Sequence, residues 1–166
     1  MPAGTAEENS LALNDIEISV IDLFVRGVQV LGLQKSVGQI YGLLFISPEP
    51  LSLDDIVDRL GISKGSASQG LKILKGLGAV TTKYLPGERR DHYVAQAELK
   101  VLVSGFVSGE LMPHLESGQD RLAVLLEECK SDESEGAKFR KERVERLRRW
   151  HGRSSKLLKT IDRFLG

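Results

Sequence analysis

The chain contains one cysteine and few aromatic residues, and it has no long apolar run. The single cysteine, Cys129, excludes a disulfide framework within the chain and a cysteine-rich metal site. No apolar segment approaches the roughly 20 residues that a helix needs to cross a bilayer. Residues 1–10 lack the basic and apolar segments of a secretory signal. We therefore expect a cytoplasmic protein that does not associate with a membrane.

Residues that carry chemistry are also sparse. The three histidines are His92, His114 and His151, and no pair of them has the spacing of metal ligands. The sequence suggests no set of a nucleophile, a base and an orienting group. We expect no metal and no cofactor, and we expect that the chain is not an enzyme.

The net charge is zero, but the charges are unevenly distributed. Residues 61–93 carry six basic and two acidic side chains, and residues 138–166 carry eleven and three. Residues 1–60 and 94–137 each carry nine acidic and three basic side chains. Phosphate binding requires a local basic patch rather than a high overall charge. The zero net charge therefore does not exclude a nucleic-acid partner.

Residues 51–93 have the pattern of a winged helix-turn-helix. Ser52 is a suitable N-cap for a first helix, because its hydroxyl can accept a hydrogen bond from a free backbone N–H. Gly61 can adopt the left-handed conformation that ends this helix. Ser63 is then the N-cap of a second helix over residues 64–77, so the segment predicts two short helices joined by a tight turn.

The second helix has an apolar face and a polar face. The apolar residues follow the helical repeat and should pack inward: Ala67, Gly70, Leu71, Leu74 and Leu77. Short side chains on the other face would let the backbone approach the major groove, where glutamine can bond to adenine and lysine to guanine or phosphate. We assign to DNA binding Ser63, Lys64, Ser66, Ser68, Gln69, Lys72 and Lys75. The alternative for each of them is an ordinary solvent-exposed position.

A β-hairpin is predicted after the second helix. Residues 79–85 and 91–94 have β-branched and aromatic side chains, and Pro86-Gly87 is a turn signal between them. The tip presents Arg89 and Arg90, which together with Lys83 would reach the minor groove or adjacent phosphates. The alternative is a hairpin tip that is merely solvated.

Residues 33–95 resemble the winged-helix region of the GbsR branch of MarR-like transcriptional regulators. The segments that carry the resemblance are GLQKSVGQIYGL (32–43), PLSLD (50–54), LGISKGS (60–66) and GERRDHY (87–93). The resemblance implies a dimeric, cytoplasmic DNA-binding regulator, often a repressor, with residues 63–75 in the major groove and residues 83–90 as the wing. Some members of the branch look to be sensors of choline- or betaine-type osmolytes, which implies a small-molecule effector.

Helices are predicted on both sides of this motif: residues 13–31, 36–47, 98–112, 115–129 and 137–165. Gly38 and Gly42 would permit a close helix crossing, and Pro113 should kink or interrupt its helix. We expect a mainly α fold with a small β-hairpin wing. Its parts would be a disordered tail (1–11), N-terminal helices plus the DNA-binding domain (12–96), and a C-terminal helical dimerisation region (97–166).

The last helix carries a heptad-like apolar seam. Its members are Val144, Leu147, His151, Ser154, Leu158, Ile161 and Leu165, and Trp150, Leu157 and Phe164 widen it. We predict a twofold dimer built from the N-terminal and C-terminal helices, which would place two second helices about one DNA turn, roughly 34 Å, apart. The alternative is a helix that packs only on its own domain. Its basic side chains could contact phosphate or form a solvated face.

An effector pocket could lie between the N-terminal helices and the dimerisation helices. A quaternary ammonium ligand would require an aromatic cage. The candidates are Phe24, Tyr41, Phe45, Phe106 and Trp150, all of which could instead be core residues.

The sequence thus predicts a dimeric, sequence-specific DNA-binding transcriptional regulator, a repressor acting on a pseudo-palindromic operator and modulated by an effector. One alternative is a winged-helix protein-interaction module without DNA binding, although the basic second helix and the paired arginines argue against it. Another is a helical protein that binds or converts a small molecule, which the lack of a polar catalytic cluster disfavours.

Overall fold

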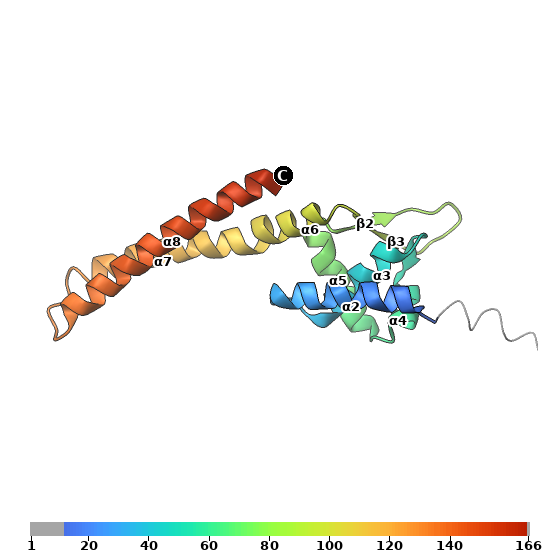
Figure 1. The fold of residues 1–166 in the computed structure, drawn as a ribbon, viewed down its shortest axis with the longest axis horizontal. Coiled ribbons are helices and arrows are strands. Elements are labelled where there is room, and N and C mark those ends of the chain that lie inside the picture. Colours follow the sequence, from blue (N-terminus) through green and yellow to red (C-terminus); the bar gives the residue numbers. More distant parts are fainter. Residues whose placement is uncertain (1–11, 166) are drawn as a thin grey trace, which may run out of the picture. The chain divides into compact units, whose positions relative to one another are not determined.

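The computed structural model describes residues 12–165, which are mainly helical with a small three-stranded antiparallel sheet (Figure 1). This confirms the predicted fold class. The chain divides into two compact units between Leu102 and Val103. The boundary predicted after residue 96 lies slightly earlier, before helix α6 (Leu99–Phe106), which crosses the division. The tail predicted over residues 1–11 lies outside the described residues.

Two helices precede the motif, α2 (Asp15–Val30) and α3 (Lys35–Ile46). They cross closely, because a Cβ atom at Gly38 would lie 2.6 Å from the Cα atom of Val25, and one at Gly42 would lie 2.8 Å from the Cα atom of Ile21. The predicted close crossing is confirmed. The completely buried side chains of α3 form the centre of this unit: Val37, Ile40, Tyr41 and Leu43.

The helix-turn-helix consists of α4 (Leu53–Leu60) and α5 (Lys64–Gly76). Ser52 caps α4, since its hydroxyl accepts the N–H of Asp55 and the carboxylate of Asp55 accepts the N–H of Ser52. Gly61 ends α4 at φ 60°. The hydroxyl of Ser63 accepts the N–H of Ser66 and caps α5. All three predicted helix-end residues are confirmed.

The sheet has the order β1-β3-β2, in which β1 is Leu51–Ser52, β2 is Val80–Lys83 and β3 is His92–Ala95. β2 and β3 are the predicted hairpin, in which β2 is shorter than predicted and β3 is shifted by one residue. β1 was not predicted, because two residues are too few to show a periodicity of side chains. Leu51 pairs with Tyr93 and Ser52 with His92, so β1 joins the start of α4 to the wing.

A half-buried ion pair joins α2 to α4. The guanidinium of Arg59 donates to the carboxylate of Glu17 over 2.6 Å, and the two side chains are 14% and 13% exposed. Burial by itself would raise the pKa of Glu17, but the N–H of Asn14 and the hydrogen bond and charge of Arg59 hold that pKa below its ordinary value. Glu17 is therefore ionised at neutral pH.

The second unit contains a π-helical segment (Val107–Leu111) and a hairpin of α7 (Met112–Glu128) and α8 (Ala137–Leu165), which lie side by side (Figure 1). The interruption predicted at Pro113 lies just before it, because α6 ends at Phe106 and the π-helical segment separates it from α7. Pro113 lies in the first turn of α7, directly after the π-helical segment. The altered spacing of backbone hydrogen bonds there accommodates a residue that has no backbone N–H.

The prediction of one continuous apolar seam on α8 is wrong, because its residues differ in burial. Val144, His151 and Leu158 are half-buried, and Val144 and His151 belong to the side that packs against α7. The ring of His151 lies over Gly118, where a Cβ atom would be 2.8 Å from Nε2. Leu147 and Ile161 are 50% and 39% exposed. The prediction merged two neighbouring stripes of the helix, of which α7 covers only one.

Candidate nucleic-acid interface

Helix α5 exposes the polar face predicted for DNA binding. The inward residues are all buried, as predicted: Ala67, Gly70, Leu71, Leu74 and Leu77. At Gly70 the helix lies directly on α3, since a Cβ atom there would be 2.5 Å from the end of the Ile40 side chain. The exposed residues are Ser63, Lys64, Ser68, Gln69, Lys72 and Lys75, and Ser66 is half-buried. This packing fixes which side of α5 faces solvent.

Ser63 and Ser66 already have partners within the helix end. Their hydroxyl oxygens are 2.9 Å apart, and the N–H of Ser66 donates to the Ser63 hydroxyl over 3.1 Å. Ser63 caps α5 and the hydroxyl of Ser66 bonds to it, so a contact of either residue with DNA would have to add to these bonds.

A first hollow runs between α5 and strand β3. It has a volume of about 240 Å³ and is lined on the α5 side by Ser68, Leu71, Lys72 and Lys75, with Leu53 and Tyr93 completing it. The ammonium of Lys75 lies 5.9 Å from the centre of the Tyr93 ring, which is a cation–π distance. The structure thus brings three of the predicted DNA-binding residues onto one side of α5.

A second hollow lies between the start of α5 and the wing. It has a volume of about 420 Å³, and its lining residues are Leu53, Asp54, Lys64, Arg89, Arg90, Asp91 and Tyr93. Leu53 and Tyr93 line both hollows. Burial, and then the neighbouring Asp91, raise the pKa of Tyr93, so its phenol stays neutral and can donate a hydrogen bond. The predicted cations of the helix and of the wing therefore share one surface.

Lys83 stands apart from these hollows. It ends β2, opposite His92, and its side chain is exposed. Nothing in the geometry of the described residues joins it to Lys64 or Arg90, so its assignment to DNA binding stays a prediction.

Asp54 and Tyr93 are residues of this surface that the sequence did not identify. From the sequence alone, Asp54 is explained as an acidic residue in the first turn of α4, where a carboxylate interacts favourably with the helix dipole. Its ion pairs join it to Lys64 and to Arg90, which come from other elements. The sequence holds no signal for such pairs, because only the packing of α4 against α5 and the wing creates them.

The neighbouring residue Asp55 is half-buried in the first turn of α4. Burial would raise its pKa, but the hydrogen bonds from Ser52 and the charges of Arg90 and His92 outweigh burial and lower the pKa. Asp55 therefore stays ionised, which maintains the cap of α4.

The five aromatic residues proposed for an effector are divided between the two units. Phe24, Tyr41 and Phe45 form a cluster with ring centres 4.9 to 6.0 Å apart. The side chain of Tyr41 is completely buried, and its hydroxyl donates to the carbonyl of Gln96 over 2.6 Å. Phe106 and Trp150 belong to the second unit, where Trp150 is 64% exposed.

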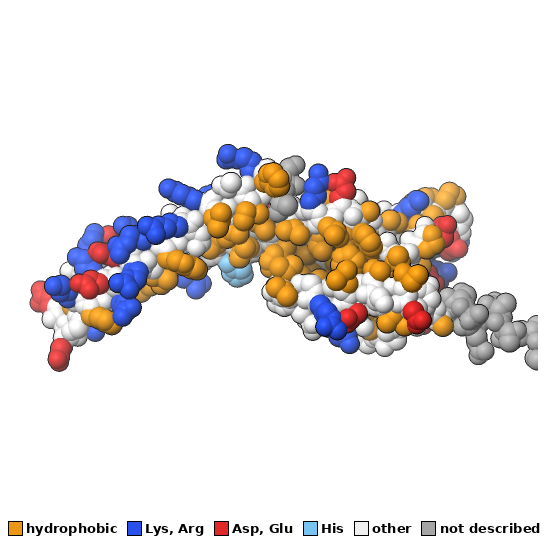
Figure 2. All heavy atoms as spheres, viewed as in Figure 1, with side chains coloured by type: hydrophobic (Ala, Val, Ile, Leu, Met, Phe, Trp, Pro, Cys, Tyr) orange, Lys and Arg blue, Asp and Glu red, His pale blue; other side chains and the backbone are white. Residues whose placement is uncertain are grey.

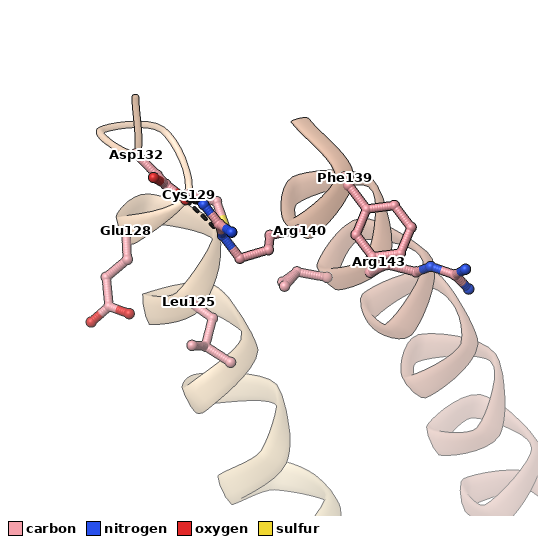
Figure 3. A pocket seen from close by; sticks show the side chains of 8 residues that line it. Leu125, Glu128, Cys129, Asp132, Phe139, Arg140 and Arg143 are labelled. Carbon is pink, nitrogen blue, oxygen red and sulfur yellow. Dashed lines mark hydrogen bonds and ion pairs between the residues drawn. The ribbon is translucent and has the colours of Figure 1, made fainter. Parts of the chain in front are cut away.

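The second unit has a hollow of its own at the loop end of the hairpin (Figure 3). It measures about 500 Å³, and its lining includes Leu125, Cys129, Phe139, Arg140 and Arg143. Arg140 is held by Asp132, whose pKa is lowered to about 2 by hydrogen bonds from Ser134 and Arg140. None of the aromatic residues proposed for an effector lines this hollow.

Comparison with known proteins agrees with the helix-turn-helix geometry. The chain is 31% identical over 87 residues to the HTH-type transcriptional repressor GbsR of Bacillus subtilis (strain 168). The aligned segment covers 52% of this chain and 48% of GbsR. It is 23% identical over 146 residues to the putative HTH-type transcriptional regulator YvaV of the same organism, and this aligned segment covers 83% of this chain and 81% of YvaV. The chain is related to HTH-type transcriptional regulators.

A solved structure titled as a transcriptional regulator has the same fold, with a TM-score of 0.62 and 16% identity over 88% of this chain and 95% of that chain. No family model matches the sequence. The matched segment spans about half the length of GbsR. Both named relatives are described as regulators and not as enzymes, in agreement with the expectation from the sequence.

Among residues 12–165, no helix is long and apolar enough to span a membrane. Within the same residues, no group of three or more histidine, cysteine, aspartate or glutamate side chains is placed to hold a metal ion.

Proposed function

We propose that the protein is a sequence-specific DNA-binding transcriptional regulator, a repressor that acts as a dimer on a pseudo-palindromic operator. One observation carries the proposal: Lys64 on α5 and Arg89 and Arg90 on the wing line a single hollow on the exposed side of a winged helix-turn-helix. The HTH-type relatives support it. A protein that binds the chromosome in this way would work in the cytoplasm.

In this proposal α5 enters the major groove. Gln69, Ser68 and Lys72 are exposed along it and can reach base edges or phosphates, while Arg89 and Arg90 grip the backbone beside the groove. The hollow along Ser68, Lys72 and Lys75 gives the sugar–phosphate backbone room to approach β3.

Replacing both Arg89 and Arg90 with alanine should weaken binding to every DNA sequence by about tenfold to a hundredfold and should reduce the salt dependence, since two phosphate contacts are lost. Fluorescence anisotropy with an upstream-gene fragment and with random DNA, across a salt series, measures both effects.

The matched control removes two exposed positive charges from the same unit outside the motif, by replacing Arg26 and Lys35 with alanine. Little change in the control, with a large change in the wing variant, is the expected pattern. If the unaltered protein fails to bind any DNA at low salt, the winged helix is a protein-interaction module and the proposed function is wrong.

The proposed dimer is supported by the apolar side chains that both units leave exposed (Figure 2). On α2 these include Ile16, Leu23 and Val30, which are 70%, 67% and 87% exposed. On α8 a stripe with alternating spacings of three and four residues stays outside the contact with α7. Its members are Leu147, Trp150, Ser154, Leu157, Ile161 and Phe164, and its apolar side chains are 39% to 91% exposed. Such a stripe on a soluble protein marks an interface.

Replacing Leu157 with glutamate should convert the dimer to a monomer at micromolar concentration, because the carboxylate would be buried without a partner in the interface. Light scattering coupled to gel filtration measures the mass. Lys156→Glu introduces the same acid one residue away, off the stripe, and should leave the dimer intact. A monomeric unaltered protein would refute the proposed dimer.

The proposal extends to an effector of the choline or betaine type. The cluster of Phe24, Tyr41 and Phe45 supports it, because aromatic rings attract a quaternary ammonium group. Since Tyr41 is completely buried, such a ligand would enter only if α2 and α3 separated locally.

A further inference from the structure

Asp54 holds two of the cations that the proposed function assigns to DNA. Its Oδ1 atom accepts a hydrogen bond from the ammonium of Lys64 over 3.0 Å, and its Oδ2 atom lies 3.8 Å from the guanidinium of Arg90. The three side chains are 49%, 68% and 58% exposed, so they meet at the surface and not in the core. One carboxylate thus bridges the start of α5 and the wing.

A carboxylate in this position resembles a DNA phosphate in its chemistry. Both groups are anions whose oxygens accept charge-assisted hydrogen bonds from ammonium and guanidinium groups. Lys64 and Arg90 line the hollow that the backbone of DNA would approach, together with Arg89. A phosphate that reaches this hollow must therefore take the two cations from Asp54 or share them with it.

We propose that Asp54 is an internal competitor for a DNA phosphate. In the free protein its single negative charge pairs with both Lys64 and Arg90, of which Arg90 also lies 3.8 Å from Glu88, and on binding the phosphate takes these cations over from Asp54. This inference rests on the proposed function. Its consequence is that Asp54 lowers affinity for all DNA sequences to a similar degree and leaves the preference for bases unchanged.

The position of Asp54 separates this role from a role in folding. The cap of α4 is formed by Ser52 and Asp55, so it does not need the Asp54 side chain. Ion pairs as exposed as those of Asp54 contribute little to folding stability. Loss of its charge should therefore change DNA binding without unfolding the motif.

The test is Asp54→Asn in the full chain, with binding to random and upstream DNA measured by anisotropy across a salt series. The variant should bind both DNAs about three- to tenfold more tightly at low salt, because two ion pairs no longer have to be exchanged. The dependence of log affinity on log salt should become steeper by up to about one unit. In a protein that also carries Lys64→Gln and Arg90→Gln, adding Asp54→Asn should no longer tighten binding.

The matched control is Asp22→Asn, which removes the same charge from an equally exposed ion pair with Arg26 on α2. Its effect should stay below about twofold, because salt screens distant exposed charges. Equal tightening by both variants would reduce the effect to net charge and overturn the inference. So would unchanged or weaker binding by Asp54→Asn while the unaltered protein binds well. Absence of binding by the unaltered protein would instead overturn the proposed function, and this inference with it.

Discussion

Replacing Arg59 with methionine is expected to lower the free energy of unfolding by about 1–3 kcal/mol, between the values for an exposed and a fully buried ion pair, because it leaves the half-buried carboxylate of Glu17 without its partner. The Arg59–Glu17 pair is short, at 2.6 Å, and both side chains are less than 15% exposed. It joins the first turn of α2 to the last turn of α4, so its loss should loosen the N-terminal helix from the helix-turn-helix. Urea unfolding followed by circular dichroism measures the change.

The same helix supplies the control. Arg26 and Asp22 form an exposed pair one turn apart on α2, and Arg26→Met should cost only about 0.3–0.5 kcal/mol. A double variant with Arg59→Met and Glu17→Gln should recover part of the loss, because it removes the uncompensated charge and keeps an amide oxygen for the N–H of Asn14. Equal losses for the Arg59 and Arg26 variants would show that the half-buried pair contributes no more than a surface pair.

The pH dependence of this pair has a definite sign. The pKa of Glu17 in the folded protein lies below the ordinary value of 4.5. The stabilising contribution of the pair is therefore complete above pH 4.5 and is lost as the pH falls through the lower folded pKa. The difference in unfolding free energy between the unaltered protein and the Arg59 variant should accordingly narrow as the pH falls below 4.5.

Gly38→Ala is expected to destabilise the first unit by about 2–3 kcal/mol, although alanine is the better helix former. The added Cβ atom would lie 2.6 Å and 2.8 Å from backbone atoms of Val25, which cannot move aside without shifting α2. Since the core residues of α3 support α5 at Gly70, a shift of α2 should also displace the exposed polar face of α5. Thermal and urea unfolding measure the loss.

Gly27→Ala is the matched control for this substitution. Gly27 lies within α2, and a Cβ atom there would meet nothing within 4 Å. The same change should therefore stabilise the protein by up to about 1 kcal/mol through helix propensity alone. Opposite signs for the two variants are the expected result, and a stabilising Gly38→Ala would contradict the close crossing of α2 and α3.

The helix-turn-helix was predictable because its determinants are local. Ser52 and Ser63 act as caps and Gly61 as the left-handed end residue, and each needs only its own neighbours within a few residues. The inward face of α5 was equally predictable, since a helical repeat of apolar residues identifies the buried side of a helix wherever its partner lies. The assignment of individual side chains to DNA contacts remains a prediction.

Other features depend on contacts between distant residues. The two-residue strand β1 exists because Leu51 and Ser52 meet Tyr93 and His92, which the local sequence does not reveal. The division of α8 into a stripe against α7 and an exposed stripe also depends on the position of α7. A heptad pattern shows which residues of α8 are apolar, but it does not show which of them α7 covers.

The sequence by itself determined the class of this protein, a winged helix-turn-helix flanked by amphipathic helices. Its second helix is basic and has short side chains on its polar face, and its wing carries arginines. Caps, turns and periodicity specify this class through interactions within a few residues. Only the tertiary structure decided which charges meet. Asp54 reaches Lys64 and Arg90, and Arg59 reaches Glu17, because folding brings together side chains that are far apart in the chain. The energy of an ion pair depends on that distance and on burial, which no local pattern encodes.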